Sequence, residues 1–239
     1  MNHEKRTTPR YDMLFEGGTF NATLLIGPDP WDAYFDSSVF LGAGLKLRNI
    51  GFKMTGSLRG YKEFRTTFDH NNNDVEARIR LVHGSNYELN LQELWQGSLI
   101  HEDFIYLKSH AGYGKHISLS DDVGIFTEAM KEGFEHPDKR PHQLYYLDCC
   151  KSEMYYKDAF RDFVGHEGVD LILHKWFCDY NKIGPMVVLI RELMAGSDFE
   201  TIVAEMNEEY GVPHFDVEDD PADMRLDRNM VTYSVGQGF

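Results

Sequence analysis

Cysteine is scarce in this sequence, and long apolar runs are absent from it. The 239 residues include three cysteines, Cys149, Cys150 and Cys178, and two of these are adjacent. Three thiols are too few for a disulfide scaffold, so we expect a reducing, cytoplasmic setting. No apolar run approaches the roughly 20 residues of a membrane-spanning helix. The polar first dozen residues also lack the apolar stretch of a secretory signal. We therefore expect no contact with membranes.

Basic residues are also few relative to acidic ones. The chain has 24 Lys and Arg against 39 Asp and Glu, a formal net charge of −15. Such a charge repels the phosphates of nucleic acids and favours basic peptides or cations as partners. Zinc-ligand spacings such as CxxC or HExxH do not occur, and neither does a glycine-rich phosphate loop. We therefore expect no nucleic-acid partner, no structural metal and no cofactor.

The composition that remains is typical of one folded domain. Hydrophobic residues make up 42% of the chain and charged residues 26%, close to the averages of globular proteins. A chain of this length can bury a full core. We expect one domain over residues 19–211, preceded by a flexible N-terminal segment (1–18) and followed by an acidic C-terminal segment (212–239).

Short apolar runs alternate with helix-length segments along the chain. Apolar runs of strand length predict strands over Ala22–Gly27, Phe52–Thr55, Val75–His83, Asp103–Lys108, Gln143–Asp148 and Val169–His174. Helical spacing and terminators predict helices over Ser38–Asn49, Gly60–Asp69, Leu89–Leu99, Asp121–Phe134, Glu153–Phe163, Pro185–Met194 and Phe199–Tyr210. This alternation predicts an α/β fold, with a mostly parallel central sheet and helices on both faces.

Reactive side chains follow two of the expected strands. Asp103–Lys108 leads into His110, and Gln143–Asp148 leads directly into Cys149 and Cys150. If these strands are parallel neighbours, both ends lie at the same edge of the sheet, where ligand sites of α/β folds form. A thiolate beside an imidazole can attack a peptide carbonyl, and the imidazole then protonates the leaving amine. The sequence therefore predicts a Cys–His site at this edge.

The two segments that carry these residues resemble a known family. LKSHAGYG (Leu107–Gly114) followed by YLDCCKS (Tyr146–Ser152) is similar to the paired motifs of caspase-like cysteine peptidases, which include caspases, metacaspases and CHAT-type proteases. The resemblance implies a caspase-hemoglobinase fold over roughly Thr19–Tyr210. It also implies that Cys150 is the nucleophile and His110 its partner.

Further site residues follow from the same resemblance. It implies that Asp148 lines a pocket for a Lys or Arg before the cut, where a carboxylate would pair with the basic group. A backbone amide of Ala111 or Gly112 would stabilise the oxyanion. The sequence departs from the family pattern at Ala111 and at Glu153, where glycine is usual.

Together these features predict a cysteine endopeptidase that cleaves proteins or peptides after Lys or Arg, in a regulated setting such as defence or cell death. Three routes of activation follow from the family. They are cleavage of the chain in the region 136–142, calcium bound near Asp121 and Asp122, and an activating protein partner.

Other interpretations stay open at this point. Cys149 could be the nucleophile, or the two adjacent cysteines could only pack in the core. Asp148 could cap the helix that follows it. The whole chain could be a catalytically inactive caspase-like module that binds a partner protein. It could also be a different α/β hydrolase or transferase that uses the same thiol on a small molecule.

Overall fold

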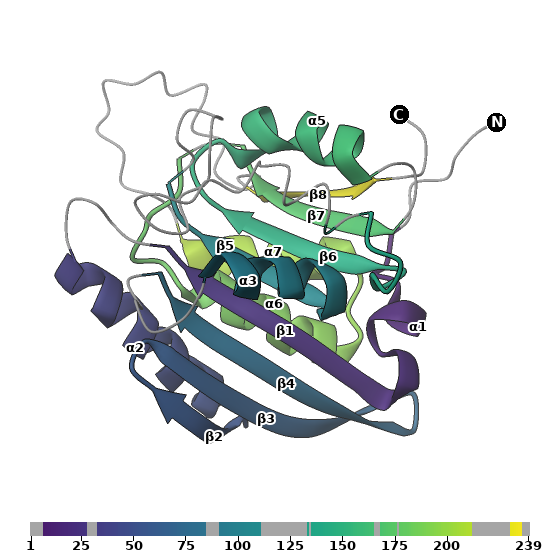
Figure 1. Cartoon of the computed structure of the whole chain (residues 1–239), viewed down its shortest axis with the longest axis horizontal. Helices are drawn as coiled ribbons and strands as arrows, with labels where there is room; N and C mark the ends of the chain where they lie inside the picture. Colours follow the sequence, from purple (N-terminus) through teal and green to yellow (C-terminus); the bar gives the residue numbers. More distant parts are fainter. Residues whose placement is uncertain are drawn as a thin grey trace.

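The structure is a computed structural model that describes residues 7–27, 33–84, 91–110, 133, 135–164, 168–175, 177–211 and 230–235. It contains one eight-stranded sheet with the order β2-β3-β4-β1-β5-β6-β7-β8 (Figure 1). The strands are β1 (Thr19–Ile26), β2 (Lys53–Leu58), β3 (Tyr61–His70), β4 (Asn73–His83), β5 (Phe104–Lys108), β6 (Gln143–Asp148), β7 (Val169–His174) and β8 (Met230–Val235). The helices are α1 (Tyr11–Leu14), the 3₁₀ helix η1 (Glu16–Gly18), α2 (Ala33–Asn49), α3 (Leu91–His101), α5 (Ser152–Val164), α6 (Gly184–Ala195) and α7 (Phe199–Tyr210).

The centre of the sheet is parallel, and its two edges are antiparallel. Strands β4, β1, β5, β6 and β7 are parallel neighbours. The hairpin β2–β3 extends the sheet beyond β4, and β8 extends it beyond β7. The predicted α/β fold with a mostly parallel central sheet is therefore confirmed. Buried parallel strands need apolar side chains on both faces, and every residue of β5, β6 and β7 is buried.

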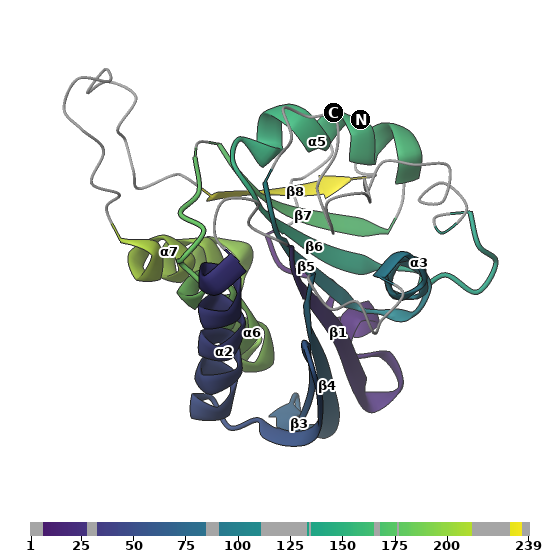
Figure 2. The same ribbon diagram turned by 60° about the vertical axis from the view of Figure 1, so that its left-hand side comes forward.

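Helices cover both faces of the sheet. Helices α2, α6 and α7 lie on one face, and α3 and α5 lie on the other (Figure 2). Each face has its own apolar cluster: Phe20, Tyr106 and Tyr146 belong to the first, and Tyr145 and Phe160 to the second. Since successive strand residues point to opposite faces, neighbouring residues such as Tyr145 and Tyr146 belong to different clusters.

The ends of α6 and α7 follow from local chemistry. Pro185 occupies the first turn of α6, where its missing N–H costs nothing. The helix ends at Gly196, whose φ of 76° lies in the left-handed region that glycine tolerates. The carboxylate of Asp198 then accepts a hydrogen bond from the backbone N–H of Thr201 at 2.8 Å and starts α7.

The helix expected over Gly60–Asp69 is wrong, because this segment is strand β3. It pairs antiparallel with β4 along its whole length. The connecting residues Asn71 and Asn72 have φ angles of 54° and 64°, the conformation that a two-residue hairpin turn requires. The predicted alternation of β4 is confirmed, since Val75, Ala77 and Ile79 are buried.

The chain termini contribute more to the fold than we expected. Residues 7–18 contain α1 and η1, and the side chains of Leu14 and Phe15 are buried in the core. The ring of Phe15 meets those of Phe20 and Phe68 edge to face. At the other end, β8 lies within the segment predicted as an acidic tail and pairs with β7.

Two expectations can be compared with the structure only in part. The helix predicted over Asp121–Phe134 falls almost entirely outside the described residues. Within the ranges that the structure describes, no helix has both the length and the apolar character needed to cross a bilayer.

We predict that Leu14→Ala lowers the free energy of unfolding by about 2–5 kcal/mol, because it leaves a cavity in the core. Leu41→Ala is the matched control, because Leu41 is 52% exposed and its loss should change stability by less than about 0.5 kcal/mol. Urea denaturation of both variants provides the measurement. A loss of stability in Leu14→Ala as small as that in the control would show that residues 7–18 do not stabilise the domain.

Candidate active site

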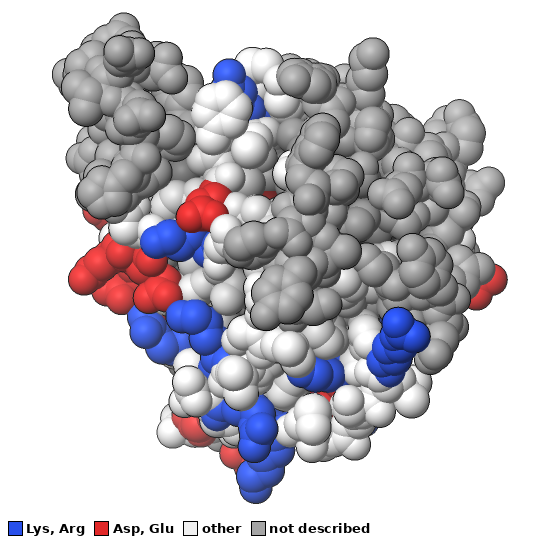
Figure 3. All heavy atoms as spheres, turned by 90° about the vertical axis from the view of Figure 1, so that its left-hand side faces the viewer, with Lys and Arg blue, Asp and Glu red and all other residues white. Residues whose placement is uncertain are grey.

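The carboxyl ends of β5 and β6 lie side by side. These strands are parallel, and Lys108 is paired with Asp148 in their register. His110 and Cys150 each follow two residues after this pair, so both belong to the same edge of the sheet, as predicted. Figure 3 shows the molecule from this side, where a group of acidic side chains borders basic ones that continue below it.

Cys150 is the more accessible of the two adjacent cysteines. Its side chain is half-buried, and its Sγ accepts a hydrogen bond from the backbone N–H of Cys178 at 3.4 Å. The two Sγ atoms lie 3.8 Å apart. A hydrogen bond with the side chain of Cys178 is the main cause of the lowered pKa of Cys150, and burial opposes this shift. The Cys178 N–H and the charges of His174 and His110 lower it further, to about 6.

Cys149 has the opposite environment. Its side chain is fully buried in the apolar cluster that α3 and α5 form with the sheet. Burial raises the pKa of this thiol well above its usual value, and the nearby charge of Asp148 raises it further. A buried, protonated thiol is a poor nucleophile. The geometry therefore distinguishes the two cysteines and favours Cys150.

His110 is oriented by an aromatic ring. Its imidazole stacks on the ring of Tyr180, with the centroids 5.7 Å apart and the planes 4° from parallel. The hydroxyl of Tyr180 donates a hydrogen bond to the carbonyl of Gly27, the residue after β1. The expected oxyanion residues Ala111 and Gly112 lie outside the described residues.

The structure corrects the role that the resemblance implied for Asp148. Its side chain is 1% exposed, and its Oδ2 accepts hydrogen bonds from Lys108 Nζ at 2.8 Å and from Tyr106 Oη at 2.7 Å. His174 Nε2 lies 3.0 Å from Oδ1. The carboxylate is thus already surrounded by donors of this chain, and it does not line an open pocket for a substrate guanidinium.

The charge of Asp148 is stabilised by these partners. Burial alone would raise the pKa of its carboxyl, but the charges and hydrogen bonds of Lys108 and His174 lower it to about 2. A buried carboxylate persists only when such donors compensate the lost hydration. Asp148 is therefore a structural anion below the site.

Lys108 connects this anion to the loop that carries Cys178. Its side chain is fully buried. Besides Asp148, its Nζ donates to the carbonyls of Asp179 and Lys182, both at 3.1 Å. A lysine ammonium has three N–H donors, so these three acceptors match its capacity. The ion pair thereby holds the 177–182 loop against the ends of β5 and β6.

Sequence reasoning missed two of these residues. No motif in the sequence points to Cys178, yet its sulfur contacts that of Cys150. For Lys108 the sequence predicts only that it ends an apolar strand. Its pairing with Asp148 was predictable once the strand register was assumed, because opposite charges then face each other. No pattern in the sequence predicted that the loop after β7 returns to Cys150.

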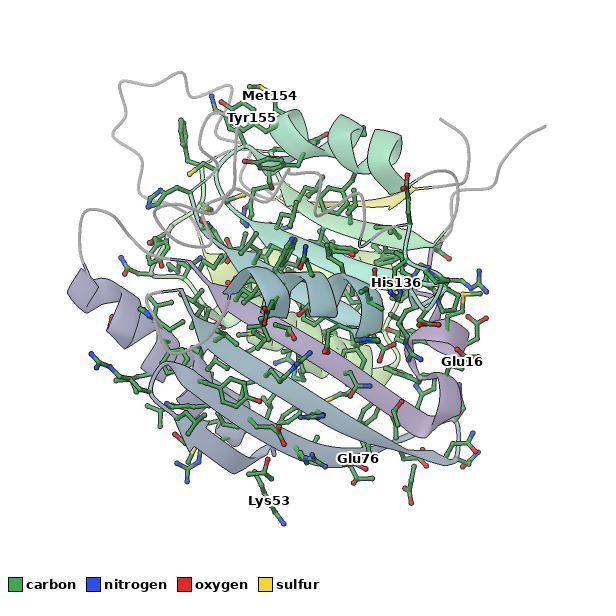
Figure 4. The ribbon with its side chains drawn as sticks, viewed as in Figure 1. Glu16, Lys53, Glu76, His136, Met154 and Tyr155 are labelled. Carbon is green, nitrogen blue, oxygen red and sulfur yellow. The ribbon has the colours of Figure 1, made fainter. Side chains whose placement is uncertain are left out.

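The region 136–142 lies at the other edge of the sheet. It precedes the start of β6, and Figure 4 shows His136 far from Met154 and Tyr155, which mark the start of α5 beside Cys150. A strand as long as β6 separates its two ends by about 20 Å. Arg140 is also anchored there, since its Nε donates to Asp103 at 2.6 Å. Cys150 therefore cannot reach this region of its own chain in this arrangement.

Among the described residues, no group of three or more His, Cys, Asp or Glu is arranged to hold a metal ion. The possible calcium ligands Asp121 and Asp122 lie outside them. In comparisons with known proteins, no family model and no curated protein matches this sequence.

We predict that Lys108→Met lowers the free energy of unfolding by about 3–5 kcal/mol, because it leaves the Asp148 carboxylate buried without its cation. Lys175→Met is the matched control, since Lys175 is exposed at the end of the neighbouring strand β7. Its effect should stay below about 0.5 kcal/mol. Urea denaturation at neutral pH measures both, and a Lys108 variant as stable as the control would contradict the structural role of the ion pair.

Proposed function

We propose that the protein is a cysteine endopeptidase that cleaves protein or peptide substrates with Cys150 as nucleophile and His110 as acid and base. One observation carries the proposal: the thiol with the lowered pKa and the imidazole follow neighbouring parallel strands at one edge of the sheet. This edge is where sites of α/β folds form. The similarity of the two motifs to caspase-like peptidases supports the same assignment.

The reaction follows from these two groups. The Cys150 thiolate attacks the peptide carbonyl carbon and forms a tetrahedral oxyanion. The C–N bond then breaks, and the imidazolium of His110 gives its proton to the leaving amine. His110 next takes a proton from water, which attacks the thioester and releases the acid product and the thiolate. The amides of residues 111 and 112, which follow His110 in the chain, are our candidates for stabilising the oxyanion.

The substrate preference requires a different carboxylate from the one first expected. Asp148 is enclosed, but Asp179 follows Cys178 directly and its side chain is exposed. Its Oδ1 accepts a hydrogen bond from the backbone N–H of Asn181 at 2.9 Å, which fixes the carboxylate within the loop. We assign to Asp179 the recognition of a Lys or Arg before the cut. A regulated role in defence or cell death, with an activating protein, remains part of the proposal.

We predict that a peptidyl electrophile labels Cys150, with a rate that falls as the pH drops below about 6. The sign follows from the pKa of Cys150, about 6, because the reactive thiolate is present above that pH and lost below it. Mass spectrometry locates the label, and fluorogenic peptides report cleavage across the same pH range. Cys150→Ala should abolish both signals, whereas Cys149→Ala should retain them.

Two outcomes would contradict the proposal. Cleavage that persists in Cys150→Ala would place the chemistry elsewhere. Labelling of Cys150 without cleavage of any peptide in a full positional panel would favour an inactive module that binds a partner, or a thiol enzyme acting on small molecules.

We further predict that Asp179→Asn lowers kcat/KM for substrates with Lys or Arg before the cut by about tenfold, the loss expected for one charge-assisted hydrogen bond. Matched peptides with an uncharged residue at that position should be cleaved equally by both proteins. Asp138→Asn is the control, since Asp138 is an exposed carboxylate at the opposite edge. An unchanged preference in Asp179→Asn would remove Asp179 from substrate recognition.

A further inference from the structure

Cys178 stands out because the proposed peptidase reaction does not use it. Its Sγ lies 3.8 Å from that of Cys150, and both thiols are free. The two sulfur atoms of a disulfide lie about 2.05 Å apart. The atoms therefore need to approach by less than 2 Å, which side-chain rotation and a small loop shift can provide.

We propose that Cys150 and Cys178 form a reversible disulfide on exposure to hydroperoxides, which switches off the thiol at the site. The disulfide itself depends only on the geometry of the two cysteines. Its consequence for peptide cleavage rests on the function proposed above.

The two thiols differ in the way this chemistry requires. Cys150 is half-exposed, and its thiolate is the form that attacks a peroxide. Contact with Cys150 is the main cause that raises the pKa of Cys178, and burial adds to it. Cys178 therefore keeps its proton while the Cys150 thiolate reacts. Once Cys150 is a sulfenic acid, the thiolate contact that raises the pKa of Cys178 is gone, and Cys178 can act as the resolving sulfur.

The reaction balances with a hydroperoxide as the oxidant. The Cys150 thiolate attacks the peroxide and the O–O bond breaks, so that Cys150 becomes a sulfenic acid. The alkoxide or hydroxide that leaves takes a proton from solvent and becomes an alcohol or water. The sulfur of Cys178 then attacks the Cys150 sulfur. The S–O bond breaks, and the proton of Cys178 leaves with the hydroxyl as water. A dithiol reductant returns two electrons and two protons and restores both thiols.

The surroundings select Cys178 over Cys149 as the resolving residue. Cys149 is adjacent in the chain, but its side chain is fully buried inside the apolar cluster beneath α5, against which Cys150 only packs. Cys178 is instead held near Cys150, because Lys108 binds the carbonyls of Asp179 and Lys182 in the same loop. A resolving thiol in contact with the reactive one favours a disulfide over further oxidation to sulfinic acid.

The full-length protein treated with a small excess of hydrogen peroxide tests the proposal. Peptide mapping without reduction should find Cys150 linked to Cys178, with the loss of two hydrogens. Labelling of Cys150 by a thiol alkylating agent should disappear and return after dithiothreitol. Cys149→Ala is the control and should form the same disulfide.

Cys178→Ser provides the second arm, since the hydroxyl keeps a polar partner for Cys150 but cannot form a disulfide. In this variant peroxide should convert Cys150 to sulfinic or sulfonic acid, and dithiothreitol should not restore labelling. A wild-type protein that shows over-oxidised Cys150 and no link to Cys178 would overturn the proposal. Mapping reads the disulfide whether or not any peptide is cleaved, so failure of the peptidase function is a separate result.

Discussion

The buried ion pair between Lys108 and Asp148 is the interaction on which the candidate site depends. It joins the last residues of two neighbouring strands, and His110 and Cys150 each follow two residues after this pair. A charge pair in the core is stable only when every donor and acceptor is satisfied. Lys108 meets this condition with two carbonyls of the 177–182 loop. The same contacts that compensate the buried charges thus bring a third segment of the chain to the site.

Strand geometry explains why two adjacent cysteines have opposite chemistry. The peptide after β6 places the side chain of Cys149 in the apolar cluster beneath α5, while Cys150 meets the polar loop. Burial favours the neutral thiol, and hydrogen bonds favour the thiolate. One residue of displacement along the backbone is therefore enough to place one thiol inside an apolar cluster and the other beside a backbone N–H donor.

The sequence predicted the parts of this fold whose signals are local. Strands β5, β6 and β7 are short apolar runs with clear ends, so their positions and shared edge could be inferred. Segment 60–69 was mistaken for a helix, since its residues do not alternate clearly and its hairpin turn depends on two asparagines in the left-handed conformation. Strand β8 (MVTYSV) alternates apolar and polar residues, but it follows an acidic stretch that led us to expect a tail. The contact between Cys150 and Cys178 could not be predicted, because it depends on the path of a loop and not on spacing.

The anchoring of the 177–182 loop by Lys108 has a mechanical consequence. Lys108 is the last residue of β5, two residues before His110, and its ammonium binds the carbonyl of Asp179, the residue after Cys178. The same ammonium also binds Asp148, the last residue of β6, two residues before Cys150. One buried side chain therefore anchors the three chain segments that carry the imidazole and the two sulfur atoms.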